Sequence, residues 1–317
     1  MMVSVVIPCY NEEKNINRTL DEILNVLNGQ SYSFEIVAVN DGSKDNTWNV
    51  IKDYAAKNDK VKGINLMANF GQSAAYQAGF DMAKGDYILT CSADLETPLK
   101  YLLDVVKLLD EGYDLVNTNR VGRWADEKAA RQTKSNYANT IITKISGVDL
   151  KDRGSGMKGF RRVIIDNLKL YGEMHRFLPD YASVYGAKIK EIDTEFNDRD
   201  FGQSYYNGHR RTVKVLLDLV TLAFMLYFAR KPFRAMPGRL FGFTGAVISG
   251  IGGLGAFYLL ILKLLGESIG NRPLFFVSIF MIVIGLQSMM MGMIGELLMR
   301  TYFESNGRKT YTVREMA

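Results

Sequence analysis

The sequence predicts an α/β protein with a mostly parallel sheet, followed by a hydrophobic C-terminal region. Residues 1–120 alternate short apolar runs with amphipathic stretches, a pattern typical of a parallel sheet with helices on both faces. Residues 240–262 and 273–295 contain no charged side chain. As helices, each would rise roughly 34 Å, which is enough to cross a hydrocarbon core of ~30 Å.

The elements of the N-terminal half follow one another in a regular order. The stretches VSVVIPCY, FEIVAVND, VKGINLM and DYILTCSAD have the composition of strands. Residues 12–28 carry apolar side chains at helical spacing. The turn DGSKDNT begins a helix after the second strand, and residues 71–85 read as a helix that ends at a glycine.

Polar residues gather where three of these predicted strands end. Because the carboxyl ends of parallel strands meet at one edge of a sheet, and ligands bind there, we expect these residues to line one crevice. The three clusters are Pro8, Tyr10, Asn11 and Glu12; Asn40, Asp41 and Gly42; and Asp94, Leu95 and Glu96.

Composition and missing motifs exclude several classes of protein. The chain is 47% hydrophobic and 23% charged, so it is neither disordered nor wholly buried in a membrane. Its two cysteines form no disulfide framework or zinc motif, which favours a reducing compartment. The first residues, VSVVIP, are expected to form a strand rather than a signal peptide. It has no dinucleotide-binding or P-loop glycine motif and no evident Ser–His–Asp set.

We divide the chain into a globular domain, 1–209, a juxtamembrane segment, 210–239, a two-helix transmembrane hairpin, 240–297, and a tail, 298–317. The juxtamembrane segment has basic ends and an apolar middle, as expected of a helix lying in the membrane interface. A core helix of the globular domain and a third membrane span are the alternatives, and the span would place Asp218 in lipid. Basic residues flank both long apolar stretches, which predicts that the globular domain is cytoplasmic.

Several stretches together resemble a known family. The blocks SVVIPCYNEEKNI, VNDGSKDNT, NFGQSAAYQAGF and GDYILTCSADLETP are similar, in order and spacing, to those of glycosyltransferase family 2. The later blocks DRGSGMKGFRR and NDRDFGQSYYNG, followed by two C-terminal spans, resemble the polyprenyl-phosphate glycosyltransferases. That group includes dolichyl-phosphate mannose synthase and the bactoprenol glucosyltransferases. The resemblance covers nearly the whole chain.

This resemblance implies a GT-A type domain that transfers a sugar, with inversion, from a nucleotide sugar to a polyprenyl phosphate on the cytoplasmic face of the cell membrane. UDP is the preferred nucleotide and undecaprenyl phosphate the expected acceptor, while the sugar is left open. A homo-oligomer, such as a tetramer, is also implied, and nucleic acid is not an expected partner. By matching motif, Pro8, Tyr10, Glu12 and Asp41 would hold the base and ribose of the donor. Arg199 and Ser204 would belong to a loop that folds over the site, and Asp152 to a block that closes over the sugar. Arg120 and Arg131 would meet the acceptor phosphate.

The metal cluster of the family falls on Ser92, Asp94 and Glu96. A divalent cation, Mg²⁺ or Mn²⁺, offsets the charge that builds on a leaving diphosphate. Mg²⁺ needs few protein carboxylates because it keeps water and phosphate oxygens as its other ligands. We therefore expect Asp94 to bind the metal, with Glu96 as a second charge and Ser92 holding a metal-bound water. The alternative is an acidic segment that only starts the helix at Thr97 and Pro98.

Basic residues after the predicted strand DLVNTNR complete the expected site. Arginines hold phosphates by bidentate, charge-assisted hydrogen bonds, and Arg120, Arg123, Arg131 and Lys134 follow one another there. The catalytic set predicted from the sequence is therefore Asp94, Asp152, Arg120 and Arg131. Two other functions stay open: a polysaccharide synthase, although the Q-x-x-R-W motif is absent, and a non-catalytic protein that binds a nucleotide sugar, which Ser92 in the metal cluster favours.

Overall fold

The computed structural model describes residues 1–122, 139–140, 142–144, 146–170, 172, 174–197, 237–304 and 313–316. The chain divides into two compact units. One consists of Met1–Ala223 together with Lys309–Ala317, and the other is Phe224–Arg308.

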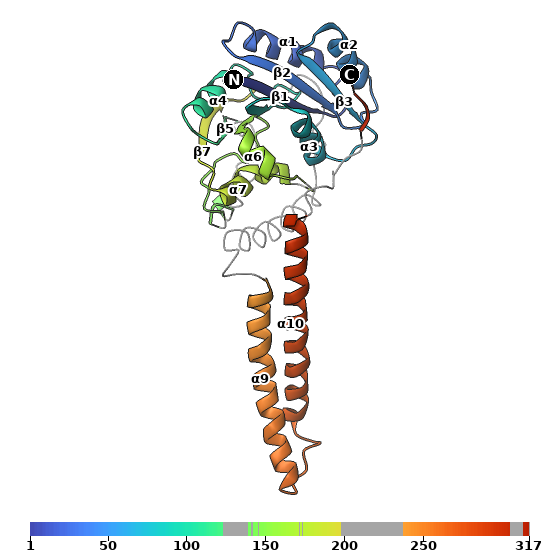
Figure 1. Cartoon of the computed structure of the whole chain (residues 1–317), viewed down its shortest axis with the longest axis vertical. Coiled ribbons are helices and arrows are strands. Elements are labelled where there is room, and N and C mark those ends of the chain that lie inside the picture. Colours follow the sequence, from blue (N-terminus) through green and yellow to red (C-terminus); the bar gives the residue numbers. More distant parts are fainter. Residues whose placement is uncertain are drawn as a thin grey trace. The chain divides into compact units, whose positions relative to one another are not determined.

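A mixed sheet forms the centre of the first unit (Figure 1). Its strand order is β7-β5-β6-β4-β1-β2-β3-β8. Strands β1, β2, β3 and β4 run parallel to one another, and β5 runs parallel to β7. Strand β6 is antiparallel to β4 and β5, and β8 is antiparallel to β3. The strands are β1 (Met2–Cys9), β2 (Ser33–Asn40), β3 (Val61–Leu66), β4 (Tyr87–Thr90), β5 (Leu115–Val121), β6 (Lys158–Arg161), β7 (Ile189–Glu195) and β8 (Val313–Met316).

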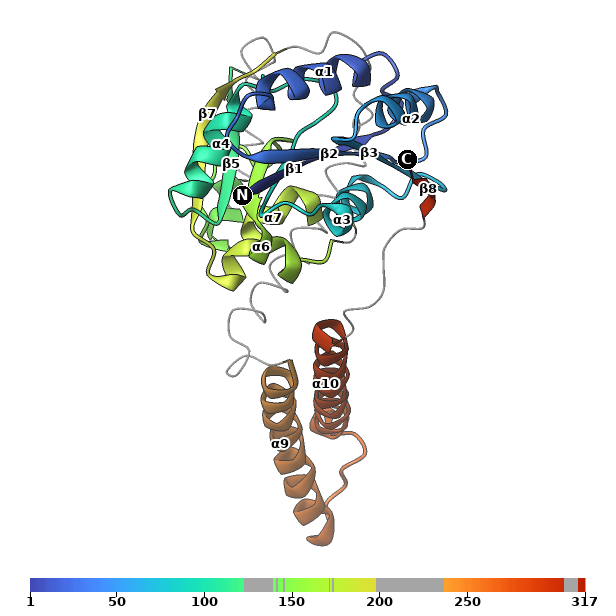
Figure 2. The same cartoon turned by 45° about the horizontal axis from the view of Figure 1, so that its top comes forward.

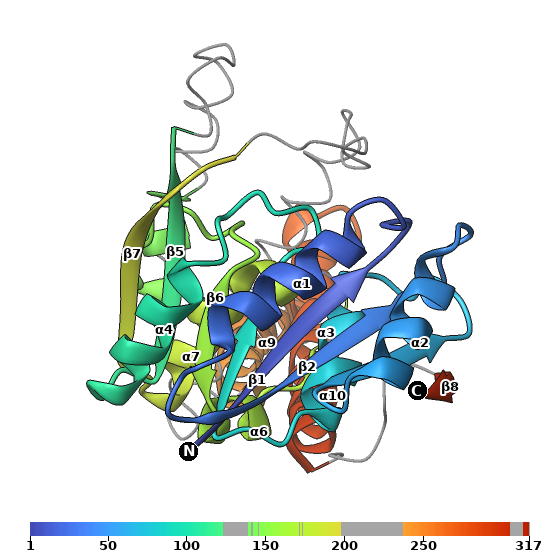
Figure 3. The same ribbon diagram turned by 90° about the horizontal axis from the view of Figure 1, so that it is seen from above.

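Helices cover both faces of this sheet (Figures 2 and 3). Helices α1 (Ile16–Leu27), α2 (Thr47–Lys57) and α4 (Tyr101–Asp110) lie on one face. Helices α3 (Gln72–Met82), α6 (Arg162–Asn167) and α7 (Leu178–Ala182) lie on the other, with the short 3₁₀ turns η1 (Met174–Phe177) and η2 (Ser183–Tyr185) next to α7 in the sequence. The sheet is therefore buried between two layers, as its continuous apolar strands require.

Side chains of β1 point alternately into the two layers of the core, one on each face of the sheet. Val3, Val5 and Ile7 belong to the cluster that includes the apolar faces of α1 and α4. Val6 points the other way, toward α3, where a side chain on Gly79 would meet its Cγ1 at 2.2 Å. Glycine at 79 thus allows α3 to lie directly on the sheet, which fixes the position of the helix that borders the site.

The second unit is a pair of helices, α9 (Pro237–Leu264) and α10 (Pro273–Glu304). Small residues let the two backbones approach closely: a side chain on Gly245 would lie 2.5 Å from the Gly285 carbonyl, and Ser249 Oγ donates to the Ile282 carbonyl at 3.3 Å. Both helices contain stretches long and apolar enough to cross a membrane, Leu240–Leu264 and Pro273–Gly295. Only 17% and 11% of the most apolar windows are buried, unlike the core helices of a soluble protein.

The predicted fold class, a mostly parallel α/β domain with two candidate membrane helices, is confirmed by these elements. Two features were not foreseen. The short antiparallel β6 separates β4 from β5, and four residues of the expected tail form β8 at the edge of the sheet. The juxtamembrane segment 210–239 lies outside the described residues except for its last three.

Candidate active site

A pocket of about 520 Å³ opens at the carboxyl ends of the central strands. It collects residues from all three polar clusters predicted from the sequence. Among its lining residues are Pro8, Tyr10, Glu12, Asp41, Ser92, Asp94, Glu96 and Arg120. Asp152 contacts this set through Arg120. The remaining predicted site residues, Arg131, Arg199 and Ser204, lie outside the described residues, as do Arg123 and Lys134.

The loop after β1 is bonded to the loop after β2. Asn11 adopts a left-handed backbone conformation, with φ of +57°, which asparagine tolerates better than most residues. Its N–H donates to Ser43 Oγ at 2.9 Å, and its side-chain oxygen accepts from the Lys44 N–H at 2.9 Å. The Glu12 N–H donates to Thr47 Oγ1 at 2.8 Å. These bonds hold Tyr10 and Glu12 at the pocket.

Asp41 lies at the end of β2 and holds the loop that leads into α3. Its carboxylate accepts from the N–H groups of Phe70, at 2.8 Å, and Gly71, at 3.0 Å. Burial raises its pKa to about 6, although these two hydrogen bonds act in the opposite direction. At Gly42, φ is +64° and an added side chain would meet the backbone of Ala68 at 2.3 Å, so only glycine fits this close crossing.

The acidic turn after β4 presents both of its carboxylates to the pocket. Leu95, between them, has φ of +55°, a strained conformation for a residue of this shape. Asp94 is partly exposed, whereas Glu96 is buried. Ser92 faces the loop before β6, because a side chain on Gly156 would approach Ser92 Oγ at 3.1 Å.

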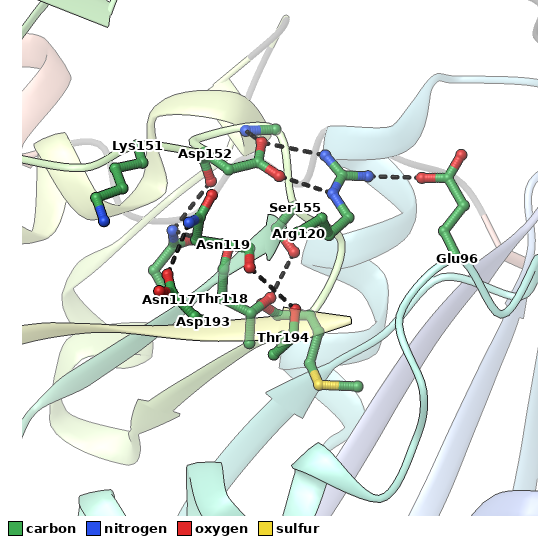
Figure 4. Close-up of polar contacts among 12 residues, drawn as sticks. Glu96, Asn117, Thr118, Asn119, Arg120, Lys151, Asp152, Ser155, Asp193 and Thr194 are labelled. Atoms are coloured by element: carbon green, nitrogen blue, oxygen red, sulfur yellow. Dashed lines mark hydrogen bonds and ion pairs between the residues drawn. The ribbon is translucent and has the colours of Figure 1, made fainter. Parts of the chain in front are cut away.

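Arg120, on β5, bridges two carboxylates that are far apart in the sequence (Figure 4). Its Nη1 donates to Glu96 Oε2 at 2.5 Å, its Nε to Asp152 Oδ2 at 2.7 Å, and its Nη2 to Asp152 Oδ1 at 3.1 Å. Burial would lower the pKa of Arg120, but the charges of Asp152 and Glu96 raise it. The guanidinium therefore stays charged. We call Arg120, Glu96 and Asp152 the Arg120 cluster; one cation and two carboxylates give it a net charge of about −1.

Strands β5 and β7 hold the loop that carries Asp152 (Figure 4). Asn117 Nδ2 donates to the Asp152 carbonyl at 3.0 Å and to Glu191 Oε1 at 2.8 Å. Thr118 Oγ1 lies 2.5 Å from Ser155 Oγ and donates to the Met157 carbonyl at 2.9 Å. Asp152 is thus fixed on both sides, by its backbone and by Arg120.

The donor atoms present fit a metal ion that shares its ligands with a substrate. Within the described parts of the chain, no group of three or more His, Cys, Asp or Glu side chains is arranged to hold a metal. Asp94 is the partly exposed carboxylate of the acidic turn, and Ser92, two residues earlier, also lines the pocket. Glu96 is engaged by Arg120. One or two carboxylates suffice for Mg²⁺ when phosphate oxygens and water complete its shell.

Two residues of the pocket were missed by the sequence analysis. Lys158, on β6, is 3% exposed, and burial lowers its pKa to about 8. His175, on η1, is packed against α3, and burial lowers its pKa to about 3. The only sequence signal was a lysine at an inward position of the block GMKGF, which cannot be recognised before the strand and its register are known.

Comparison with known proteins identifies the family. The model of the family described as "Glycosyl transferase family 2" matches residues 4–169. A curated relative from Rhizobium johnstonii, "Dodecaprenyl-phosphate galacturonate synthase", is 33% identical over 99% of this chain and 92% of its own. "Undecaprenyl-phosphate 4-deoxy-4-formamido-L-arabinose transferase" from Aeromonas hydrophila is 32% identical over 99% of this chain and 94% of its own. The chain belongs to glycosyl transferase family 2, and it is a glycosyltransferase.

Solved structures agree with the fold. Glucosyl-3-phosphoglycerate synthase from Mycobacterium tuberculosis, in complex with UDP, superposes with a TM-score of 0.54 at 18% identity, over 70% of this chain and 80% of that one. The same enzyme with Mn²⁺ and UDP-glucose gives a TM-score of 0.53 at 17% identity, over 69% and 78% of the two chains. At this identity the likeness shows a shared fold of the GT-A type.

Proposed function

We propose that this protein transfers a sugar, with inversion, from a UDP-sugar to undecaprenyl or a similar polyprenyl phosphate at the cytoplasmic face of the cell membrane. The observation that carries the proposal is the pocket at the end of β1, β2 and β4 in a chain that also has two exposed apolar helices. The two curated relatives named above, matched over nearly their whole length, are named for a polyprenyl phosphate.

The donor's nucleoside is assigned to the ends of β1 and β2. Asp41 offers carboxylate oxygens that can accept from a base N–H or a ribose hydroxyl, and Tyr10 and Glu12 line the same pocket. The loops there are bonded to each other and to Asp41, so this part of the pocket is preorganised for binding. Arg199 and Ser204 are proposed to close over the donor.

The reaction needs no base to activate the acceptor. A phosphate monoester has a second pKa near ~6 and is largely a dianion at neutral pH. One of its oxygens attacks the anomeric carbon as the bond from that carbon to the diphosphate breaks, and the electron pair leaves with the nucleoside diphosphate. No proton has to move. The task of the protein is to bring two anions together in line.

The Arg120 cluster positions the groups on the acceptor side of the pocket. Three of the guanidinium's five N–H groups are used by Glu96 and Asp152, which leaves two that can reach a phosphate oxygen. Asp152 is held rigidly by Arg120, and we propose that it accepts a hydrogen bond from a hydroxyl of the sugar. Arg131 is proposed to add the positive charge that the Arg120 cluster lacks.

A divalent cation, Mg²⁺ or Mn²⁺, would be held by Asp94 with help from Ser92, and it would supply Lewis-acid stabilisation of the leaving diphosphate. Glu96 was predicted to supply a second charge at this metal, but its carboxylate forms an ion pair with Arg120. We propose that Glu96 acts mainly by setting the charge and position of Arg120.

The test is transfer of a labelled sugar into a lipid that can be extracted with organic solvent. Purified protein is given undecaprenyl phosphate, Mg²⁺ or Mn²⁺, and a panel of UDP-sugars. A lipid-linked monosaccharide is expected. A water-insoluble polymer would instead support a polysaccharide synthase, and binding without transfer would support a non-catalytic nucleotide-sugar-binding protein. Asp94→Asn serves as the inactive control.

A further inference from the structure

The order of the strands predicts where each part of a donor would lie. From one side of the pocket to the other, the sheet runs β2, β1, β4, β6. The proposed nucleoside residue Asp41 follows β2, and the proposed metal residue Asp94 follows β4. A nucleotide sugar is linear in the same sense, with its diphosphate between the nucleoside and the sugar. A sugar attached to a diphosphate at Asp94 would therefore reach the region of β6.

At that position on β6 the pocket is lined by a buried cation, Lys158. Lys158 is paired in the sheet with Thr90 of β4 and Asn117 of β5. Its Nζ donates to the Ser155 carbonyl, but within the described parts of the chain it forms no ion pair. Since burial lowers its pKa only to about 8, the side chain is still mostly charged at neutral pH.

The carboxylates around Lys158 are committed to other groups. The three whose charges affect it are those of Asp152, Glu191 and Asp180. Asp152 is bonded to Arg120, and Asp180 forms a buried ion pair with Arg153. Glu191 accepts from Asn117 and from two backbone N–H groups. A buried charge that is not paired is costly, so the pocket is poised to accept an anion beside Lys158.

His175 adds a neutral N–H donor to the pocket, close enough to Lys158 for that charge to contribute to lowering the pKa of the ring. Ser73 Oγ, which is buried, accepts from the His175 backbone N–H at 3.1 Å, and it lies 2.9 Å from His175 Nδ1. The hydroxyl proton of Ser73 has no other partner among the described residues, so it is donated to Nδ1. The ring is neutral, with its pKa near 3, and its proton is therefore on Nε2, the nitrogen left to bind a ligand in the pocket.

We propose that Lys158 and His175 form a subsite for an oxyanion on the donor sugar, and that the preferred donor carries a carboxylate, as in a hexuronic acid. This inference rests on the proposed function and names its substrate class. A neutral hexose would leave the charge of Lys158 uncompensated, whereas a uronate would pair with it. The other source of an oxyanion is the donor diphosphate, and the experiment separates the two.

The experiment measures binding of UDP, UDP-glucose, UDP-glucuronate, UDP-galactose and UDP-galacturonate by calorimetry to the full-length protein with Mn²⁺. The wild type should bind at least one uronate tenfold or more tightly than the matching neutral sugar. Lys158→Met should abolish that preference and leave the affinity for UDP within about twofold. Lys188→Met, which changes an exposed lysine just before β7, should alter neither. Lys158→Arg should keep part of the preference.

Three results would overturn the assignment. Equal binding of uronate and neutral donors by the wild type would do so without any variant, which keeps the test decisive if Lys158→Met does not fold. An equal loss of UDP and UDP-uronate binding in Lys158→Met would assign Lys158 to the diphosphate instead. Efficient transfer of a neutral hexose with no uronate transfer would refute the subsite but support the proposed function, whereas absence of binding and transfer with every UDP-sugar would count against the proposed function itself.

Discussion

Arg120 and Asp152 share two parallel hydrogen bonds, Nε to Oδ2 at 2.7 Å and Nη2 to Oδ1 at 3.1 Å, although they lie 32 residues apart in the sequence. This bidentate arrangement is the most specific that a guanidinium and a carboxylate can form. The third bond of Arg120, to Glu96, extends the contact to the acidic turn after β4. One side chain therefore connects β5, the loop before β6 and the turn that carries Asp94.

Replacing Arg120 with methionine should lower the free energy of unfolding by about 3–5 kcal/mol, because the substitution leaves two largely buried carboxylates without their countercharge. Chemical denaturation of the detergent-solubilised protein measures this. Lys100→Met removes one partner of the exposed pair with Glu195 and should leave the free energy of unfolding unchanged. A wild-type unfolding curve for the Arg120 variant would show that the cluster does not stabilise the fold. In the double variant Arg120→Met/Glu96→Leu, stability should recover in part while transfer activity does not.

Metal binding should depend on the nucleotide. Because Asp94 is the one partly exposed carboxylate of the acidic turn, Mn²⁺ should bind weakly alone and at least tenfold more tightly with UDP present, as followed by the electron paramagnetic resonance of free Mn²⁺. Asp94→Asn should remove the UDP-dependent binding. Glu96→Gln should weaken it by less than threefold, since Arg120 already neutralises that carboxylate. An equal loss in both variants would make Glu96 a metal ligand, as the sequence resemblance implies.

Donor binding should weaken in mild acid. Burial raises the pKa of Asp41 to about 6, and only the ionised carboxylate accepts hydrogen bonds with both oxygens. Affinity for a UDP-sugar should therefore be constant above pH 7 and fall by up to tenfold per pH unit below about 6. A UDP-sugar is used because the terminal phosphate of UDP itself titrates near ~6. Asp41→Asn should bind more weakly but without this pH dependence, and a pH-independent wild type would exclude Asp41 as an acceptor for the donor.

The ligand-free protein should become more stable when Lys158 is replaced by methionine. Burial lowers the folded-state pKa of Lys158 from 10.5 to about 8, so at pH 7 its charge costs on the order of 3 kcal/mol. Between pH 8 and 10.5 the unfolded chain binds more protons at Lys158 than the folded protein does. The free energy of unfolding of the wild type should therefore rise with pH across that window. The melting temperature of Lys158→Met should be higher at pH 7 and should lack this rise. A lower melting temperature at pH 7 would mean that the bond to the Ser155 carbonyl outweighs the burial of charge.

The sequence was sufficient for the features that depend on local pattern. Apolar periodicity located β1, β2, β3 and β4 with the helices between them, and strand ends placed Asp41 and Asp94 in one pocket. It was not sufficient for contacts that depend on strand register and chain reversal. Lys158 and His175 carry no motif of their own, and the partner of Glu96 is decided by the position of β5.

The same limit explains why Glu96 was assigned to the metal alone. From the sequence, two acidic residues separated by one position are equivalent candidates, and the left-handed conformation of Leu95, which sets where each one lies, has no signature in a leucine. Only the fold distinguishes the partly exposed carboxylate of Asp94 from the buried one of Glu96.

The antiparallel pairing of β8 with β3 restricts how the chain can be threaded through a lipid bilayer. Two hydrogen-bonded strands must lie in the same aqueous compartment, so the number of crossings between Leu66 and Val313 has to be even. If the candidate spans of α9 and α10 both cross the bilayer, they provide one outward and one return passage. A third crossing would leave β8 on the opposite side of the membrane from β3, its partner in the sheet. The pairing of these two strands therefore allows only an even number of crossings between them.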